Sequence, residues 1–148
     1  MNLSIKPAEA IDIEPLFELN KLLIEQYEDL SSIDLAEILA WVRRKLTKKI
    51  SEYRVVCLGG ETVGYYRLCD GEDNMLEIDD LYVLAPYRRL GIGTEIVRRC
   101  IAESERLGKP LMLYVFTNNT PAVRLYEKMG FVLKKTISPN RSILVRPL

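Results

Sequence analysis

Residues 88–94 read Arg88-Arg89-Leu90-Gly91-Ile92-Gly93-Thr94 and join a predicted strand to a predicted helix. The glycines at 91 and 93 let the backbone turn tightly and approach a ligand without an intervening Cβ. The first turn of the helix offers unpaired N–H groups and a partial positive charge, which suit a phosphate. Arg88 and Arg89 add guanidinium donors. The loop therefore indicates an anion site, unless its glycines serve only the turn.

Two common phosphate-binding loops do not fit this stretch. A dinucleotide-binding G-x-G-x-x-G loop needs a third glycine where the chain has Ile96. A nucleotide-triphosphate P-loop needs Gly-Lys followed by Ser or Thr, whereas Gly93 is followed by Thr94 and Glu95. The pattern that does fit is Arg/Gln-x-x-Gly-x-Gly/Ala.

A second motif lies downstream, where residues 113–131 read LYVFTNNTPAVRLYEKMGF. They contain a strand followed by Asn-x-x-Ala-x-x-Leu-Tyr-Glu-Lys-x-Gly-Phe. With the strand Leu76–Val83 that precedes the glycine loop, the two motifs resemble those of the GNAT family of N-acetyltransferases. The order of helices and strands matches that family from Leu3 to Val145, so the resemblance covers essentially the whole chain.

Apolar periodicity and turn residues predict eleven elements in the order β-α-α-β-β-β-α-β-α-β-β. Asp34 is expected to cap the second helix, and Gly108 followed by Pro110 to end the third. No repeat, linker or low-complexity stretch divides the chain. We therefore expect an α/β fold, one domain over residues 1–148, with a GNAT-like mixed central sheet flanked by helices.

The composition limits the chemistry. The chain has 148 residues, of which 48% are hydrophobic, enough for one domain with its own core. It has no histidine, which excludes Ser-His-Asp and Cys-His nucleophile systems, His-ligated metals and an imidazole base. Cys57, Cys69 and Cys100 lack metal-ligand spacing, so we expect no metal and interpret them as reduced, packed thiols. Protons must then move through carboxylate, tyrosine, lysine, cysteine or water.

The charge is balanced overall but divided along the chain. Residues 88–148 carry 12 basic and 4 acidic side chains, whereas residues 1–87 carry 9 and 17. This division favours an anionic ligand on the second half and a cationic one on the first, unless the charges merely cancel across the folded surface. Because the basic residues are scattered, we expect no nucleic-acid partner. With no secretory signal and no apolar run near ~18 residues, we expect a cytoplasmic protein and no membrane partner.

The resemblance implies that the chain binds acetyl-CoA and passes the acetyl group directly to an amine. The backbone of Leu81, Tyr82 and Val83 would hydrogen-bond the pantetheine arm like an added strand. Asn119 would contact the pantetheine or order the loop beside it. The pyrophosphate would lie in the loop that begins at Arg88, cradled by the amides of Arg89, Leu90, Gly91, Ile92, Gly93 and Thr94.

Tyr126 matches the tyrosine that enzymes of this family often use to protonate the departing thiolate. A phenol with a pKa of ~10 can donate to a sulfur atom as negative charge develops there. Two other interpretations stay open. Tyr126 would either contact the cofactor without essential chemistry or pack as a core aromatic beside Leu125, Met129 and Phe131.

Glu77 is the candidate general base. It lies 11 residues before Arg88, a spacing that resembles that of the catalytic glutamate in the family's histone-acetylating branch. An ammonium must lose a proton before it attacks, and without histidine a carboxylate acting directly or through water is the natural acceptor. Asp79 is expected on the same strand face and Asp80 on the opposite one. Alternatively, this face attracts the amine without taking its proton.

The resemblance places the acceptor pocket at the first two helices and the final strands. Tyr65, Tyr66 and Tyr82 would line it or pack in the core, and Trp41 is interpreted as packing. Tyr114 stands where relatives that acetylate the N-terminus of a ribosomal protein carry glutamate, which argues against that activity. Five acidic residues at the helix junction would attract a cationic amine or simply be solvated: Glu25, Glu28, Asp29, Asp34 and Glu37.

Two function classes follow. The first is an N-acetyltransferase that works through a ternary complex and acetylates a primary amine, expected to be cationic, of a small molecule or peptide. The second is a non-catalytic acyl-CoA-binding or regulatory module on the same fold. Both need the 88–94 loop, but only the first needs Tyr126 and a proton acceptor. The sequence leaves open the identity of the amine and whether the chain forms a homodimer.

Overall fold

All seven strands form one mixed sheet in the order β1-β2-β3-β4-β5-β7-β6. The computed structural model describes all 148 residues. Every neighbouring pair of strands is antiparallel except β4 and β5, which are parallel. The strands are β1 (Leu3–Pro7), β2 (Tyr53–Leu58), β3 (Glu61–Asp70), β4 (Leu76–Val83), β5 (Leu111–Phe116), β6 (Val132–Ser138) and β7 (Arg141–Arg146). This arrangement confirms the predicted element order and the mixed central sheet.

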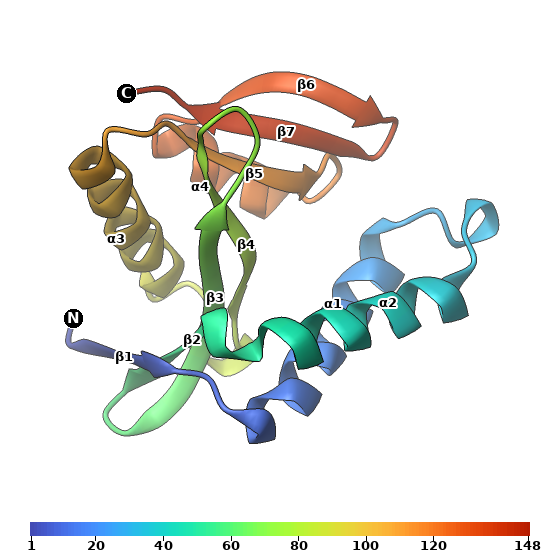
Figure 1. The fold of residues 1–148 in the computed structure, drawn as a ribbon, viewed down its shortest axis with the longest axis horizontal. Helices are drawn as coiled ribbons and strands as arrows, with labels where there is room; N and C mark the ends of the chain where they lie inside the picture. Colours follow the sequence, from blue (N-terminus) through green and yellow to red (C-terminus); the bar gives the residue numbers. More distant parts are fainter.

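Four helices flank the sheet (Figure 1). They are α1 (Ile13–Tyr27), α2 (Leu35–Lys49), α3 (Ile92–Leu107) and α4 (Thr120–Lys128). The predicted signals act as expected: the side chain of Asp34 accepts from the backbone N–H of Glu37, and Gly108 ends α3 in a left-handed conformation. The helical periodicity of residues 9–30 predicts a longer first helix, but a 3₁₀ turn occupies Ala10–Asp12 and Glu28 is already extended. None of these helices is long and apolar enough to cross a bilayer.

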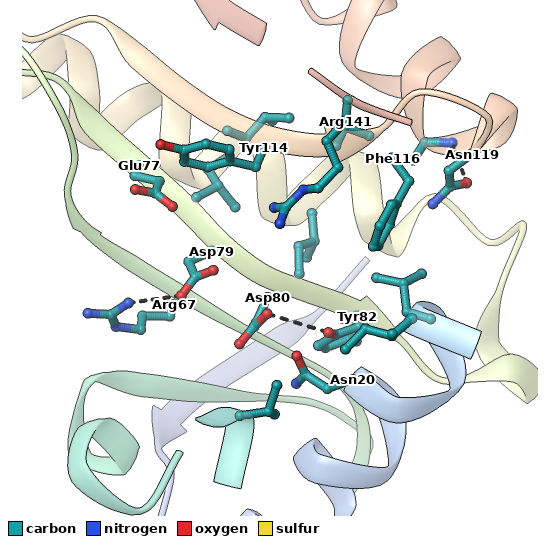
Figure 2. Close-up of a pocket in the computed structure, with 18 of the residues that line it drawn as sticks. Asn20, Arg67, Glu77, Asp79, Asp80, Tyr82, Tyr114, Phe116, Asn119 and Arg141 are labelled. Carbon is teal, nitrogen blue, oxygen red and sulfur yellow. Dashed lines mark hydrogen bonds and ion pairs between the residues drawn. The ribbon is translucent and has the colours of Figure 1, made fainter. Parts of the chain in front are cut away.

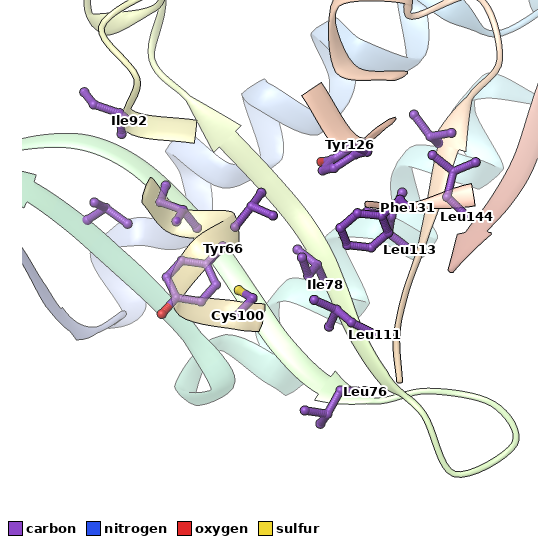
Figure 3. Close-up of a cluster of buried hydrophobic side chains, with 14 of the residues drawn as sticks. Tyr66, Leu76, Ile78, Ile92, Cys100, Leu111, Leu113, Tyr126, Phe131 and Leu144 are labelled. Atoms are coloured by element: carbon purple, nitrogen blue, oxygen red, sulfur yellow. The ribbon is translucent and has the colours of Figure 1, made fainter. Parts of the chain in front are cut away.

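Two clusters of buried side chains hold the helices on the sheet. In the larger one, Ile92, Ile96 and Val97 of α3 pack with strand residues and with Tyr126 of α4 (Figure 3). The smaller one joins α1 and α2 to β2 and β3, through residues such as Leu16 and Leu46. Burial of this apolar surface is the main force that fixes the helices in place. Helices α3 and α4 therefore share one cluster, while α1 and α2 share the other.

Strands β4 and β5 separate soon after they meet. Their pairing consists of Leu76 with Leu111 and Glu77 with Met112, and no further pair is formed between them. The rest of β4 keeps its hydrogen bonds to β3 on the other side, for example at Tyr82 and Val83. One edge of β4 is therefore left without a partner strand beyond Glu77, and a gap opens in the middle of the sheet.

A β-bulge lies in β4, next to this gap. Tyr82 pairs with Tyr65 and Asp79 pairs with Arg67, so β4 has one more residue between these pairs than β3 has. The extra residue coincides with the left-handed φ of 52° at Asp80. Because a bulge breaks the alternation of side chains, Asp80 lies on the same side as Asp79, and both contact Lys45 of α2. The prediction that Asp80 points to the opposite face is therefore wrong.

Candidate functional site

A cavity of about 640 Å³ lies where the gap between β4 and β5 faces α1 and α2. Its walls come from both helices, from β3, β4 and β5, and from α4 and the start of β7 (Figure 2). The volume lies within the usual range for small-molecule sites. Of the residues predicted to act in catalysis or to hold the cofactor, Glu77, Leu81, Tyr82, Asn119 and Tyr126 line it.

Glu77 is half-buried, and its carboxylate faces the cavity without a hydrogen-bond partner in the protein. Burial raises its pKa to about 7, and the negative charge of Asp79 acts in the same direction. The positive charges of Lys45 and Arg67 oppose this shift without cancelling it. A carboxyl group with this pKa takes up and releases a proton at neutral pH, which is the behaviour that a general base requires.

A network of charged side chains lies beneath Glu77. Lys45 Nζ is 2.6 Å from Asp79 Oδ2 and 3.2 Å from Asp80 Oδ2. Arg67 binds Asp79 at 2.8 Å, and the hydroxyl of Tyr53 donates to Asp80 at 2.5 Å. Burial and the charge of Asp79 raise the pKa of Asp80, while its partners lower it. The network anchors the bulge of β4 to α2 and β2, so it fixes the floor of the cavity.

The Tyr53 hydroxyl gives a testable measure of this anchoring. We expect Tyr53→Phe to lower the free energy of unfolding by about 2 kcal/mol, because a hydrogen bond to a charged group contributes roughly 1.5–3 kcal/mol. Urea unfolding followed by circular dichroism measures it. Tyr65→Phe is the matched control, because the Tyr65 hydroxyl meets Asp12 at 3.4 Å and should cost much less. Equal losses in the two variants would contradict the anchoring role of Tyr53.

Tyr126 projects from α4 into the gap between the strands. The residue is 8% exposed, and its ring packs edge-on against Phe131 with the ring centroids 5.5 Å apart. Figure 3 shows the ring at the edge of the buried cluster. The hydroxyl has no acceptor in the protein, yet the residue lines the cavity. Burial raises the pKa of the phenol above its usual value, so the hydroxyl is protonated at neutral pH and can donate.

The loop at residues 88–94 has the geometry of an anion site. The backbone amides of Arg89 through Thr94 donate to no main-chain acceptor, and they surround the start of α3, where the helix dipole is positive. Gly91 is the N-cap of α3 and has a φ of 83°, a left-handed conformation that favours glycine at this position. At Gly93 a Cβ would meet Leu125 at an ordinary 3.4 Å, so only Gly91 is conformationally required. Arg88 donates from Nε to the carbonyl of Val83 at 3.0 Å, which ties the loop to β4.

Asn119 stands at the start of α4. Its side-chain oxygen accepts from the backbone N–H of Ala122 at 3.4 Å, so it caps the helix as well as lining the cavity. Leu81, Tyr82 and Val83 are the part of β4 whose outer edge has no partner strand. Leu81, Tyr82 and Asn119 line the cavity, whereas Val83 and residues 88–94 do not. The loop is joined to this region through the bond from Arg88 to the Val83 carbonyl and lies next to Leu125 of α4 at Gly93.

Several residues that line the cavity were given no functional role in the sequence analysis, among them Trp41, Lys45, Arg67 and Arg141. The interpretation of Trp41 as packing is wrong, because the residue is 54% exposed and lies in the cavity wall. Ile38, Trp41 and Lys45 lie one turn apart on α2 and all line the cavity, but this spacing suits a core position equally well and so did not identify Trp41 as a wall residue. No comparable signal marked Arg141.

The five acidic residues at the helix junction do not together form an acidic surface at the cavity. Of its five residues only Glu28 lines the cavity, where Asn140 donates to its carboxylate. Asp29 and Asp34 instead accept backbone N–H bonds at the starts of helices.

Of the three tyrosines proposed for the pocket, Tyr82 lines it and Tyr65 and Tyr66 do not. The negative charge of the cavity comes mainly from β4. No group of three or more Cys, Asp or Glu side chains is placed to hold a metal ion.

Comparison with known proteins gives a consistent result. The family model described as "Acetyltransferase (GNAT) family" matches residues 16–131. A Sulfurisphaera tokodaii protein named N-alpha-acetyltransferase is 27% identical over 141 residues, which cover 86% of this chain and 78% of that protein. A mycothiol acetyltransferase from Corynebacterium glutamicum is 33% identical over 79 residues. This match covers 53% of the chain but only 27% of the mycothiol enzyme.

The fold has close counterparts among solved structures. PaiA N-acetyltransferase from Thermoplasma acidophilum, solved in complex with coenzyme A, superposes with a TM-score of 0.74. The two sequences are 20% identical, and the superposition covers 100% of both chains. At this identity the likeness establishes the shared fold.

Proposed function

This chain belongs to the GNAT family of acetyltransferases, and on that premise we propose that it transfers an acetyl group from acetyl-CoA directly to a primary amine. The observation that carries the proposal is the row of six unpartnered amides, Arg89 through Thr94, at the start of α3. Such a row suits a diphosphate, because each N–H can donate to an oxygen and the helix dipole favours the negative charge.

The residues present fit coenzyme A. The amides of Arg89 through Thr94 would hold its pyrophosphate, and the free edge of Leu81, Tyr82 and Val83 would pair with the amide groups of the pantetheine arm. Asn119 would contact that arm at the start of α4. When bound, acetyl-CoA supplies the thioester carbonyl that an amine attacks.

Glu77 and Tyr126 would move the two protons. Glu77, with its pKa raised to about 7, would accept a proton from the ammonium either directly or through a water molecule. Tyr126 keeps its proton because burial raises its pKa, and it would donate from the phenolic oxygen to the departing thiolate. Both residues line the same cavity, which supports their acting on one reaction.

The acceptor would enter from the side of α1 and α2. The carboxylates of Glu28, Asp79 and Asp80 line this side together with Glu77 and would attract an ammonium group. The Sulfurisphaera tokodaii relative is named N-alpha-acetyltransferase, so peptide α-amines belong among the acceptors to be tested.

The test combines turnover with binding. We expect the purified protein to release free thiol from acetyl-CoA with at least one member of a panel of polyamines, aminoglycosides, amino acids and peptides. We expect Gly91→Ala to weaken coenzyme A binding at least about tenfold in calorimetry, because an alanine at a φ of 83° costs roughly 1–2 kcal/mol and shifts the amides that follow.

Gly108→Ala is the matched control. Gly108 lies at the other end of α3 with a φ of 65°, so its substitution strains the same helix without touching the loop. Both variants should lose stability, but only Gly91→Ala should lose coenzyme A affinity. Equal affinity in the two variants would refute the anion site. Tight binding with no transfer to any amine would favour the non-catalytic acyl-CoA-binding module.

A further inference from the structure

Arg141 opens strand β7 and projects into the cavity from the wall opposite β4 (Figure 2). It pairs in the sheet with Phe116 of β5 and Ser138 of β6. Its guanidinium carbon lies 5.4 Å from the ring centroids of both Tyr114 and Phe116. The two aromatic rings orient the guanidinium by cation–π attraction.

Arg141 differs from the other basic groups of the cavity in having no anionic partner. Lys45 is bound to Asp79 and Asp80, and Arg67 is bound to Asp79 and Glu52. No carboxylate lies within 4.0 Å of the Arg141 guanidinium, and no hydrogen-bond acceptor engages it. A guanidinium presents five N–H donors in a planar fork, which matches the two oxygens of a carboxylate.

The hairpin that carries Arg141 is fixed to the rest of the site. The backbone N–H of Thr117 donates to the carbonyl of Asn140 at 2.9 Å. The side chain of Asn140 donates to Glu28, which directly follows α1, and accepts from the hydroxyl of Ser138 at 2.8 Å. These contacts hold the turn between β6 and β7 next to the end of α1, and so they fix the position of Arg141 at the start of β7.

The cavity therefore has opposite charges on two walls. Glu77, Asp79 and Asp80 project from β4, and Arg141 faces them from β7 (Figure 2). Asp79 and Asp80 are neutralised in part by Lys45 and Arg67, whereas Arg141 is not neutralised by any residue. Because Arg141 is exposed, an acceptor with only an amine would meet the acidic wall and leave the guanidinium bound to water alone.

We propose that the acceptor is a primary amine that also carries a carboxylate, and that Arg141 binds this carboxylate while the amine is held at the β4 wall. This inference rests on the proposed acetyltransferase function and narrows its substrate class. It also refines the expected cationic acceptor, because only the reacting end then needs a positive charge. A free amino acid and a peptide whose first residue is acidic both present this chemistry.

Matched substrate pairs provide the test. Each amino acid is compared with the amine that lacks its carboxylate: lysine with cadaverine, phenylalanine with phenethylamine, and leucine with isoamylamine. In the wild-type protein we expect a higher kcat/KM for the carboxylate-bearing member. In Arg141→Gln we expect kcat/KM for that member to fall about tenfold or more, mainly through KM, since one charge-assisted contact of about 1.4 kcal/mol corresponds to tenfold. For the decarboxylated member we expect less than about a twofold change.

Arg106→Gln is the control, because Arg106 lies near the end of α3 and its ion pair is with Glu103. It should leave all substrates unchanged. Amidated tripeptides that begin with Asp or Asn distinguish the two sources of the carboxylate. An Arg141-dependent preference for the Asp peptide over every free amino acid assigns the site to peptides, and the reverse assigns it to free amino acids.

Two results would overturn the proposal. One is an equal loss in Arg141→Gln for both members of each pair, which would make Arg141 a general support of the pocket. The other is no loss for either member. If the wild-type protein acetylates none of these amines, the proposed function fails for this substrate class. Calorimetric binding of the same pairs in the presence of coenzyme A then tests the Arg141 site separately, and equal affinities with and without the carboxylate would refute it.

Discussion

Tyr126→Phe is expected to lower kcat about 100-fold while the affinity for coenzyme A stays within about twofold. The substitution removes only the hydroxyl, which has no acceptor in the protein, and keeps the ring that packs on Phe131. General acid catalysis contributes typically 10²–10⁴-fold. The lower end applies here, because a thiolate with an ordinary pKa near 8.5 leaves with modest assistance.

Tyr66→Phe separates catalysis from packing. Tyr66 and Tyr126 belong to the same buried cluster and are both 8% exposed, but Tyr66 does not line the main cavity. Burial raises the pKa of both phenols. Thiol release under saturating acetyl-CoA measures kcat, and calorimetry measures binding. If the two variants lose activity to the same small extent, Tyr126 is a packing residue and the proton donor lies elsewhere.

Glu77→Gln is expected to lower kcat/KM about 100-fold and to remove a pH dependence centred near pH 7. The base works only when deprotonated, and the pKa of Glu77 is raised to about 7 by burial and by Asp79. Activity of the wild-type protein should therefore rise about tenfold per pH unit below pH 7 and level off above it. Glutamine keeps the size of the side chain but accepts no proton, so the rise in activity with pH below pH 7 should disappear.

Glu103→Gln is the control for Glu77, because Glu103 lies on α3 and pairs with Arg106. It should preserve both the rate and the pH profile. A pH limb near 7 that persists in Glu77→Gln would assign the proton to another group, such as Asp80, whose pKa is also raised by burial. An unchanged rate would leave Glu77 as a polar wall residue.

The same pKa shift affects stability. Glu77 holds its proton up to about pH 7 in the folded chain, whereas an unfolded glutamate releases it near the ordinary value of 4.5. The folded state thus binds more protons than the unfolded state between these values. The contribution of Glu77 to stability is therefore largest at low pH and falls as the pH rises from about 4.5 to 7. Glu77→Gln should flatten this part of the stability profile.

The local elements were predictable because their signals lie in consecutive residues. Asp34 caps α2 through a backbone N–H three residues away, and Gly108 ends α3 through its own φ. The loop at 88–94 likewise depends on neighbouring amides and on Gly91. Such features need no distant contact, so propensity, capping and turn chemistry specify them directly.

The acceptor side could not be predicted in the same way. The register of β4 against β3 forces one extra residue at Asp80 and turns its side chain toward Lys45, which lies 35 residues earlier in the chain. Trp41 stands in a cavity wall because α2 packs beside the gap, although its spacing equally suited a core position. Nothing local in the sequence distinguishes these placements.

The sequence alone determined the order of elements, the family resemblance and the position of the glycine loop at 88–94 before α3, because each depends on short-range patterns of residues. Only the tertiary structure decided which charges meet. The separation of β4 from β5 opened the gap, the bulge set Asp80 beside Asp79, and the pairing of β7 with β5 placed Arg141 opposite them. These outcomes depend on strand register and helix packing between distant segments, and therefore on the balance of contacts over the whole sheet.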